Sequence, residues 1–482
     1  MKKSRLPSTR PATLTLLALC SLVIILAASY AQTLAPDLTW ANAGADGGDL
    51  ITAAATRGVP HPSGYPLYLL LARLFQAIPW GTLAWRTNLM SAVFAVLAVT
   101  LLFRHVERSF DCPSAWLTAL LFGLSPLLWS QAVITEVYSL HVFLAGALLY
   151  CYRFVAPSPK NSFFEGTLLG LAAGNHLTIL ILAPILLWKG GGKAKLFRLS
   201  GMLAGIGIYG VLPLHARSGS PVNWGNPVTL QNLFWLVSGS LYQPRLGNLS
   251  MIEIVERLRG WAGILLNQFS AVGVLVGFYG LLSPVMASQR KVTLWIFFAF
   301  SLFSVLYATP DSYLYLLPAM LVFAWWIGGG LYEIKASFLQ KFPQTLKIAL
   351  FSLIALTLWL RAMFVTLPQV NASQDDRAVE FAEEVLSQAP PEAILVADTD
   401  REVFTIWYFH FALGTRPDVR IVAEGLLPFE WYQQTLHSTY PDLRLPSQGQ
   451  ATVATLLMLN ADRAVCLLND TGKPHLTCTG YR

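Results

Sequence analysis

Long segments without charged residues dominate the chain up to residue 369. An α-helix rises about 1.5 Å per residue, so roughly twenty apolar residues cross a hydrocarbon core of ~30 Å. Ten segments approach or exceed this length, the last of them with Arg361 near its end: 11–32, 87–103, 113–135, 137–152, 166–188, 199–214, 260–289, 292–310, 312–332 and 348–366. The pattern predicts a bundle of membrane-spanning helices.

One of these segments is interrupted by polar residues. Gly174, Asn175 and His176 would lie at bilayer depth, so 163–188 is either one helix or two short helices that meet at this tip. A split leaves 17 Lys and Arg residues on the side of the N-terminus and seven in the opposite loops before residue 361. One helix would move the basic cluster at 189–198 to the other side. Basic residues favour the cytoplasm, so we expect a split and eleven spans.

The N-terminal residues Lys2, Lys3, Arg5 and Arg10 precede the first apolar segment. This pattern is typical of a cleaved signal peptide, for which 29–31 is a loose small-x-small site, or of an uncleaved first helix. Because further spans follow, we expect an uncleaved helix with a cytoplasmic N-terminus. Eleven spans then place the C-terminal region outside.

The composition agrees with a membrane protein. Hydrophobic residues make up 55% and charged residues 12% of the 482 residues, whereas soluble domains have about 25% charged residues. This excludes soluble, disordered and fibrous classes. Residues 1–369 hold 25 Lys/Arg and 11 Asp/Glu, and residues 370–482 hold 8 and 15. We expect a basic transmembrane domain, an acidic extracytoplasmic domain and no nucleic-acid partner, because basic loops suit anionic lipid.

The first outer loop, 32–86, carries two closely spaced carboxylates. Asp46 and Asp49 follow a Gly-rich turn and precede an Ala-rich stretch, which would put Asp49 in a first helical turn and Asp46 at or before its N-cap. The pair is either a set of ordinary caps or a general base at the membrane surface. A rigid turn containing His61 follows. The aromatic and Leu-rich stretch Tyr65–Phe75 is then typical of a helix lying along the headgroups.

These residues carry a specific resemblance. Asp46-Gly47-Gly48-Asp49-Leu50 and His61-Pro62-Ser63-Gly64-Tyr65-Pro66-Leu67 resemble the D-x-G-[ED]-L and H-P-x-G-Y-P-L signature of a membrane family with a domain of unknown function. The family's vertebrate member is a protein O-mannosyltransferase, and it belongs to the GT-C superfamily of polyprenyl-phosphate-sugar-dependent glycosyltransferases. Weaker matches follow in order at 129–131, 136–140, 170–178, 311–313, 407–408 and 416–419.

The resemblance covers most of the chain and implies a GT-C fold. This would be an α-helical polytopic membrane protein with about eleven spans, interfacial helices in the first outer loop and a small C-terminal α/β extracytoplasmic domain. GT-C enzymes place a catalytic acid in that loop. The resemblance therefore implies Asp46 as the base and Asp49 as the second candidate. The family often has Glu at the position of Asp49, so the division of roles between the two stays open.

Other polar residues complete the predicted site. Glu136 lies where two predicted spans meet on the outer side and is either an interfacial acid or a third catalytic residue, the alternative that the family match favours. His176, at the tip of the split segment, either faces a ligand cavity or satisfies its own turn. Outer-loop arginines suit a lipid phosphate, although each is alternatively an interfacial residue. We predict a substrate-binding set of His61, Tyr65, His176, Arg217 and Arg245, with Arg257 and Arg259 as further phosphate candidates.

Residues 370–482 alternate in an α/β manner. Strands are expected at 393–397, 419–423 and 465–468, with helices at 401–413 and 428–437, which predicts a small layered domain that helps acceptor recognition. Asp398 and Asp400 follow the first strand, where such folds bind ligands, but we expect ordinary loop acids. Cys466 and Cys478 share this domain, which would allow a disulfide.

These features together predict a glycosyltransferase that moves a sugar, with mannose suggested by the resemblance, from a polyprenyl-phosphate donor to a hydroxyl acceptor at the outer face. The acceptor is a protein, lipid or polysaccharide. Such donors need no nucleotide, and two acids near a histidine would permit a divalent metal. A flippase of lipid-linked sugars and a non-catalytic envelope scaffold are the alternatives. We expect a multi-pass protein surrounded by membrane lipids, in a bacterial plasma membrane or a eukaryotic endoplasmic reticulum.

Overall fold

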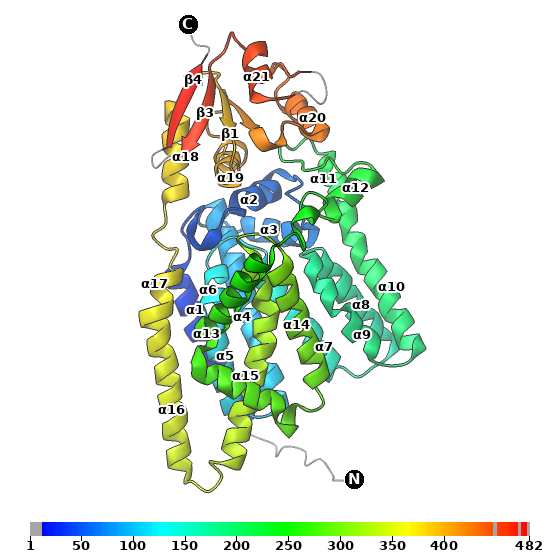
Figure 1. The fold of residues 1–482 in the computed structure, drawn as a ribbon, viewed down its shortest axis with the longest axis vertical. Coiled ribbons are helices and arrows are strands. Elements are labelled where there is room, and N and C mark those ends of the chain that lie inside the picture. The colour runs from blue at the N-terminus through cyan, green and yellow to red at the C-terminus, as the bar shows by residue number, and fades with distance from the viewer. Residues whose placement is uncertain (1–11, 447–450, 471–473, 480–482) are drawn as a thin grey trace.

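The computed structural model describes residues 12–446, 451–470 and 474–479, so the basic N-terminal residues of the predicted topology lie outside the described range. Helices form a long bundle, and a small sheet lies at one end of it (Figure 1). The helices of the bundle and its loops are α1 (Ala12–Thr33), α2 (Gly47–Thr56), α3 (Pro66–Gln76), α4 (Leu83–Ser109), α5 (Cys112–Gly123), α6 (Pro126–Ala132), α7 (Tyr138–Phe154), α8 (Pro159–Ala173), α9 (Ala183–Trp188), α10 (Gly192–Ile206), α11 (Val211–Ala216), α12 (Leu230–Val237), α13 (Met251–Leu282), α14 (Arg290–Leu306), α15 (Leu317–Ser337), α16 (Gln344–Arg361) and α17 (Leu367–Val370).

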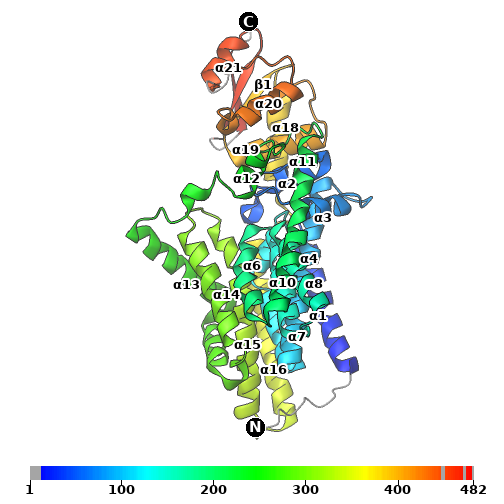
Figure 2. The ribbon, with the colours of Figure 1, turned by 90° about the vertical axis from the view of Figure 1, so that its right-hand side faces the viewer.

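The apolar segments of the sequence lie on these helices. Within the described residues, six helices are long and apolar enough to cross a membrane, or up to seven if the bent pair α5 and α6 is one span. The chain is accordingly an integral membrane protein, while the count of eleven spans and their direction stay predictions. Helix α15 lies inside the bundle, because 94% of its most apolar stretch is buried. In α16 only 6% of the corresponding stretch is buried, so this helix lies at the outside (Figures 1 and 2).

The split predicted at Gly174, Asn175 and His176 is present. α8 ends at Ala173, and a 3₁₀ turn, Leu177–Leu182, leads into the short helix α9. A continuous helix would have carried the polar side chains of Asn175 and His176 into lipid. The break instead turns them toward protein, and the Asn175 side chain donates to the Val137 carbonyl at 3.2 Å.

Helix α10 packs very closely against α8 because glycines line the contact. A Cβ added to Gly170 would lie 2.2 Å from the Met202 carbonyl oxygen, and one added to Gly205 would lie 2.4 Å from that of Thr167. Small residues permit such backbone approach in membrane bundles. At one end of this pair the buried Glu165 binds Arg198 at 2.7 Å and Lys189 at 3.1 Å.

The C-terminal region has the predicted α/β character, and its sheet has four strands where three were predicted. Its elements are α18 (Arg377–Gln388), β1 (Ile394–Ala397), α19 (Asp400–Trp407), β2 (Arg420–Ala423), α20 (Glu430–Thr439), α21 (Val453–Leu459), β3 (Val465–Asp470) and β4 (Pro474–Thr479). The strand order is β2-β1-β3-β4. β1 is parallel to both neighbours, with Ile394 opposite Arg420 and Val465, whereas β4 is antiparallel to β3. The sequence pattern missed β4 because it has no apolar run. Cys466 and Cys478 form a disulfide across β3 and β4.

The sheet domain docks on the first loop of the bundle through α19, which lies directly above α2 (Figure 1). A Cβ added to Gly48 of α2 would lie 2.1 Å from the Phe404 carbonyl oxygen, so only glycine fits there. Trp40 Nε1 donates to Thr405 Oγ1 at 2.9 Å, and the Trp40 N–H donates to Asp375 at 2.9 Å. The two parts therefore share one packed interface.

Candidate functional site

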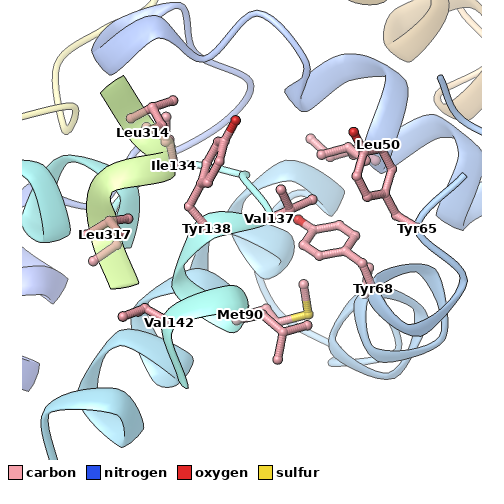
Figure 3. Packing of buried hydrophobic residues seen from close by; sticks show 14 of the residues in the cluster. Leu50, Tyr65, Tyr68, Met90, Ile134, Val137, Tyr138, Val142, Leu314 and Leu317 are labelled. Atoms are coloured by element: carbon pink, nitrogen blue, oxygen red, sulfur yellow. The ribbon is translucent and has the colours of Figure 1, made fainter. Parts of the chain in front are cut away.

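A cavity of about 860 Å³ lies at this interface. Five parts of the chain line it: the first loop, the junction of α6 and α7, the break after α8, the loop after α12, and the segment from the end of α14 to the turn before α15. The start of α19 joins them. Its polar and ionisable lining includes Asp46, His61, Tyr65, Glu136, Tyr138, His176, Tyr242, Arg245, Tyr307, Asp311, Tyr315, Asp400 and Arg401. Leu50, Tyr65, Val137, Tyr138 and Leu314 belong both to this lining and to the apolar core. Figure 3 shows the packing of these core residues. The cavity walls are therefore held by core packing.

Asp46 presents a carboxylate to the cavity. It is the N-cap residue of α2, as predicted, yet its side chain accepts no capping hydrogen bond, and 37% of the side chain is exposed. The capping interpretation therefore does not explain Asp46. Burial of the carboxylate, and to a smaller extent the nearby Asp311, Asp400 and Asp49, raise the pKa of Asp46 to about 6, although His61 acts to lower it.

Asp49 lies behind the cavity wall and is fully buried. Its Oδ2 accepts from the backbone N–H of His61 at 2.9 Å and faces His61 Nδ1 at 2.7 Å. Its Oδ1 accepts from Trp224 Nε1 at 3.3 Å. The two acids, which the sequence presents as a similar pair, thus differ: one faces the cavity and the other holds His61.

The loop containing His61 is fixed against a distant segment. The Val59 N–H donates to the Val222 carbonyl at 2.8 Å, and the Trp224 N–H donates to the Val59 carbonyl at 3.0 Å. This pairing brings Trp224 to Asp49. His61 Nε2 then lies 3.5 Å from Asp46 Oδ2 and 3.0 Å from the Tyr65 hydroxyl.

Glu136 and His176 also line the cavity, as the sequence predicts. His176 Nδ1 lies 2.8 Å from Thr178 Oγ1, and the ring lies among those of Tyr65, Tyr138 and Tyr315, with centroids 5.2–6.3 Å away. Both alternatives for His176 therefore apply, because it makes a hydrogen bond within its own turn and also faces the cavity. Its aromatic surroundings give the cavity several flat apolar faces.

The candidate arginines have different positions. Arg245 lines the cavity, with its guanidinium carbon 5.7 Å from the centre of the Tyr242 ring. Arg217 ends α11 with an exposed side chain and is outside the lining. Arg257 binds backbone carbonyls, including that of Val305 at 2.9 Å, and so holds the turn that carries Asp311. Arg257 therefore stabilises this turn and is not part of the cavity lining.

Three charged lining residues were not predicted. In the sequence, Asp311 belongs only to a weak family match. The expectation that Asp400 is an ordinary loop acid is corrected, because Asp400 lies in the cavity lining at the start of α19. Arg401 follows it, with its guanidinium carbon 5.1 Å from the Trp40 ring centre. The sequence places α19 after a strand but gives no signal that this end meets the first loop.

The described residues contain no group of three or more His, Cys, Asp or Glu side chains arranged to hold a metal ion. His61 and the acids near it make hydrogen bonds and ion pairs with one another instead.

Similar solved structures define the class of fold. The chain superposes on ArnT from Cupriavidus metallidurans bound to undecaprenyl phosphate with a TM-score of 0.57 at 12% identity, over 96% of this chain and 94% of that one. The mycobacterial arabinofuranosyltransferase AftD gives a TM-score of 0.53 at 13% identity, over 96% of this chain and 35% of that one. The fold is the GT-C membrane fold.

Sequence comparisons are more specific. Residues 46–190 match the family model of the protein O-mannosyl-transferase TMEM260 N-terminal domain, and residues 378–452 match TMEM260-associated domain 2. The mouse protein O-mannosyl-transferase TMEM260 is 27% identical over 443 residues, covering 84% of this chain and 62% of that protein. The Dictyostelium discoideum protein of the same name is 22% identical, covering 86% and 58%. The chain thus spans about three fifths of these relatives. The chain has the GT-C fold, and over these residues it is similar to the O-mannosyl-transferase family.

Proposed function

We propose that this protein is a membrane glycosyltransferase that moves a sugar from a polyprenyl-phosphate donor onto a hydroxyl acceptor. Asp46 accepts the proton of the acceptor hydroxyl. The acceptor oxygen then bonds to the anomeric carbon as the bond from that carbon to the phosphate oxygen breaks. Polyprenyl phosphate leaves with the electron pair. The reaction is balanced without any other reactant, because the donor already carries an activated sugar.

One observation carries this proposal. The carboxylate of Asp46 makes no capping hydrogen bond to α2 and faces a cavity large enough for a sugar. A general base needs an ionised carboxylate within reach of the acceptor and a pKa near the working pH. The position of Asp46 in the cavity lining would put it within reach of an acceptor. A pKa of about 6 is near the working pH and keeps this carboxylate mostly ionised at neutral pH. Asp49 is too deeply buried to meet an acceptor.

Two cations of the described lining suit the donor phosphate. Arg245 comes from the loop after α12 and Arg401 from α19. Guanidinium groups bind phosphate oxygens in a bidentate manner and offset the charge that grows on the leaving group. The similar ArnT structure has undecaprenyl phosphate bound, which supports the same class of donor here.

The names of the relatives support a protein acceptor and mannose as the sugar. The cavity lies between the bundle and the sheet domain, so an acceptor would approach beside α19. We propose that this side of the membrane is the outer one, as the loop charges predict.

The test uses the full chain in nanodiscs with polyprenyl-phosphate mannose and a serine- and threonine-rich protein acceptor. We expect Asp46→Asn to reduce sugar transfer by roughly a hundredfold or more, as for loss of a general base. The matched control is Asp376→Asn, since Asp376 is also an N-cap residue without a side-chain cap but is exposed and outside the cavity lining.

Equal transfer by both variants would contradict the role of Asp46. Movement of the lipid across the membrane without release of sugar, in the wild type, would overturn the enzyme proposal in favour of a flippase. Neither activity with several sugar donors would favour a scaffold.

A further inference from the structure

His61 lies between two carboxylates and a phenol. Its Nδ1 is 2.7 Å from Asp49 Oδ2, and its Nε2 is 3.5 Å from Asp46 Oδ2 and 3.0 Å from the Tyr65 hydroxyl. Only 7% of its side chain is exposed. The Phe404 ring stacks on it at 6.2 Å with an interplanar angle of 16°. The imidazole is thus fixed in position by contacts at both ring nitrogens and against the Phe404 ring.

Counting protons defines the charge of this ring. The Tyr65 hydroxyl has one proton and lies 3.1 Å from the Pro62 carbonyl and 3.0 Å from His61 Nε2. The carbonyl can only accept, so when it receives the phenol proton the Tyr65 oxygen accepts from His61 Nε2–H. Asp49 is an acceptor and already receives the N–H groups of His61 and Trp224, so His61 Nδ1 also donates. Both ring nitrogens then carry a proton, and the ring is an imidazolium.

We propose that His61 is held as an imidazolium by Asp49, and that this cation keeps Asp46 ionised for the transfer reaction. Asp49 is then a positioning residue that acts through His61, and Trp224 orients its other oxygen. The inference rests on the proposed function, because it explains how Asp46 stays a base among other acids.

Every charged neighbour acts on this pair. His61 faces Asp46 and Asp49 from the start of α2, Asp400 from α19, Glu136 from the junction of α6 and α7, and His176 from the break after α8. Asp46 also faces Asp311 and Glu136. Burial alone would lower the pKa of His61, but Asp46 and Asp49 outweigh it and raise the pKa to about 9. Without the cation, those acids and burial would raise the pKa of Asp46 further.

The protonation of His61 can be measured apart from activity. Diethylpyrocarbonate modifies neutral imidazole and not imidazolium, and mass spectrometry of peptides locates the modified ring. We expect wild-type His61 to react with a midpoint near pH 9. Asp49→Asn keeps the size and removes the charge, which should lower that midpoint by about 1–3 pH units. Asp49→Glu keeps the charge and should stay near the wild type. Exposed His437 reports that the reagent is active.

The same variants predict a change in transfer. In Asp49→Asn the acidic limb of the pH–rate profile moves to higher pH because Asp46 loses its cation, which costs about tenfold in rate for each pH unit on that limb. The KM for the donor should not change. A merely structural role for Asp49 would lower the rate equally at every pH.

A wild-type midpoint near 6.5, the ordinary value for histidine, would overturn the inference. So would an unchanged His61 profile and an unchanged acidic limb in Asp49→Asn. If His61 resists modification in all three proteins, the pH–rate profile alone decides. If the wild type transfers no sugar while His61 still titrates as expected, the proposed function fails and the imidazolium stands.

Discussion

Gly48 joins the catalytic loop to the sheet domain, so its substitution tests whether that interface sets the site. A Cβ at Gly48 would lie 2.1 Å from the Phe404 carbonyl oxygen, whereas ordinary contact begins near 3.4 Å. The Gly48→Ala variant must therefore move α19 from α2 by about 1.3 Å. Overpacking of this kind costs about 1–3 kcal/mol.

The shift should reach the site directly. Asp46 lies two residues before Gly48, and Asp400 begins the helix that carries Phe404. A misplacement of about 1 Å in a catalytic group lowers the rate by about a hundredfold. We therefore expect Gly48→Ala to lose most sugar transfer in the nanodisc assay and to expose the segment before α18 to protease.

The matched control is Gly47→Ala, at the neighbouring position of the same helical turn. A Cβ there meets Leu38 Cδ1 at 3.4 Å, which is ordinary contact. Both variants gain the same helix propensity. Equal transfer rates and equal protease resistance in the two variants would refute the idea that the α2–α19 interface positions the site.

Three further outcomes follow from the contacts. Transfer by the wild type should fall as the pH drops through about 6, because protonation removes the base Asp46; a rate that is flat from pH 5 to 8 would contradict this. Gly170→Leu should separate α8 from α10 and lower the unfolding temperature in detergent, whereas Gly191→Ala, with no atom within 4 Å of the added Cβ, should not. Glu165→Gln leaves the buried Arg198 without its anion and should destabilise the protein by about 3–5 kcal/mol. An unchanged unfolding temperature in the same assay would argue against that ion pair.

Much of the helical architecture is visible in the sequence. Uncharged runs the length of a bilayer are stable only as helices, because the lipid offers no partner for backbone groups. The break at Gly174–His176 follows from the same reasoning, since polar side chains need protein around them. The cap position of Asp46 is also set locally, by a Gly-rich turn. The first three strands of the sheet domain follow in the same way from short apolar runs.

The site could be predicted only in part. Its motif residues Asp46, His61 and Tyr65 are close in sequence, and they meet in the cavity. Asp400 and Trp224 come from distant segments, and nothing in their local sequence indicates which surface they meet. The different roles of Asp46 and Asp49 also depend on burial, which the spacing of the two residues does not reveal.

The sequence by itself determined the membrane helices, the α/β character of the last hundred or so residues and the polar motif of the first loop, because hydrophobic runs, turns and caps act over a few residues. Tertiary structure alone decided that α19 lies on α2, that Trp224 reaches Asp49 and that Arg217 stays outside while Arg245 enters the cavity. Those outcomes depend on the packing of segments up to hundreds of residues apart, where shape and burial select the partners.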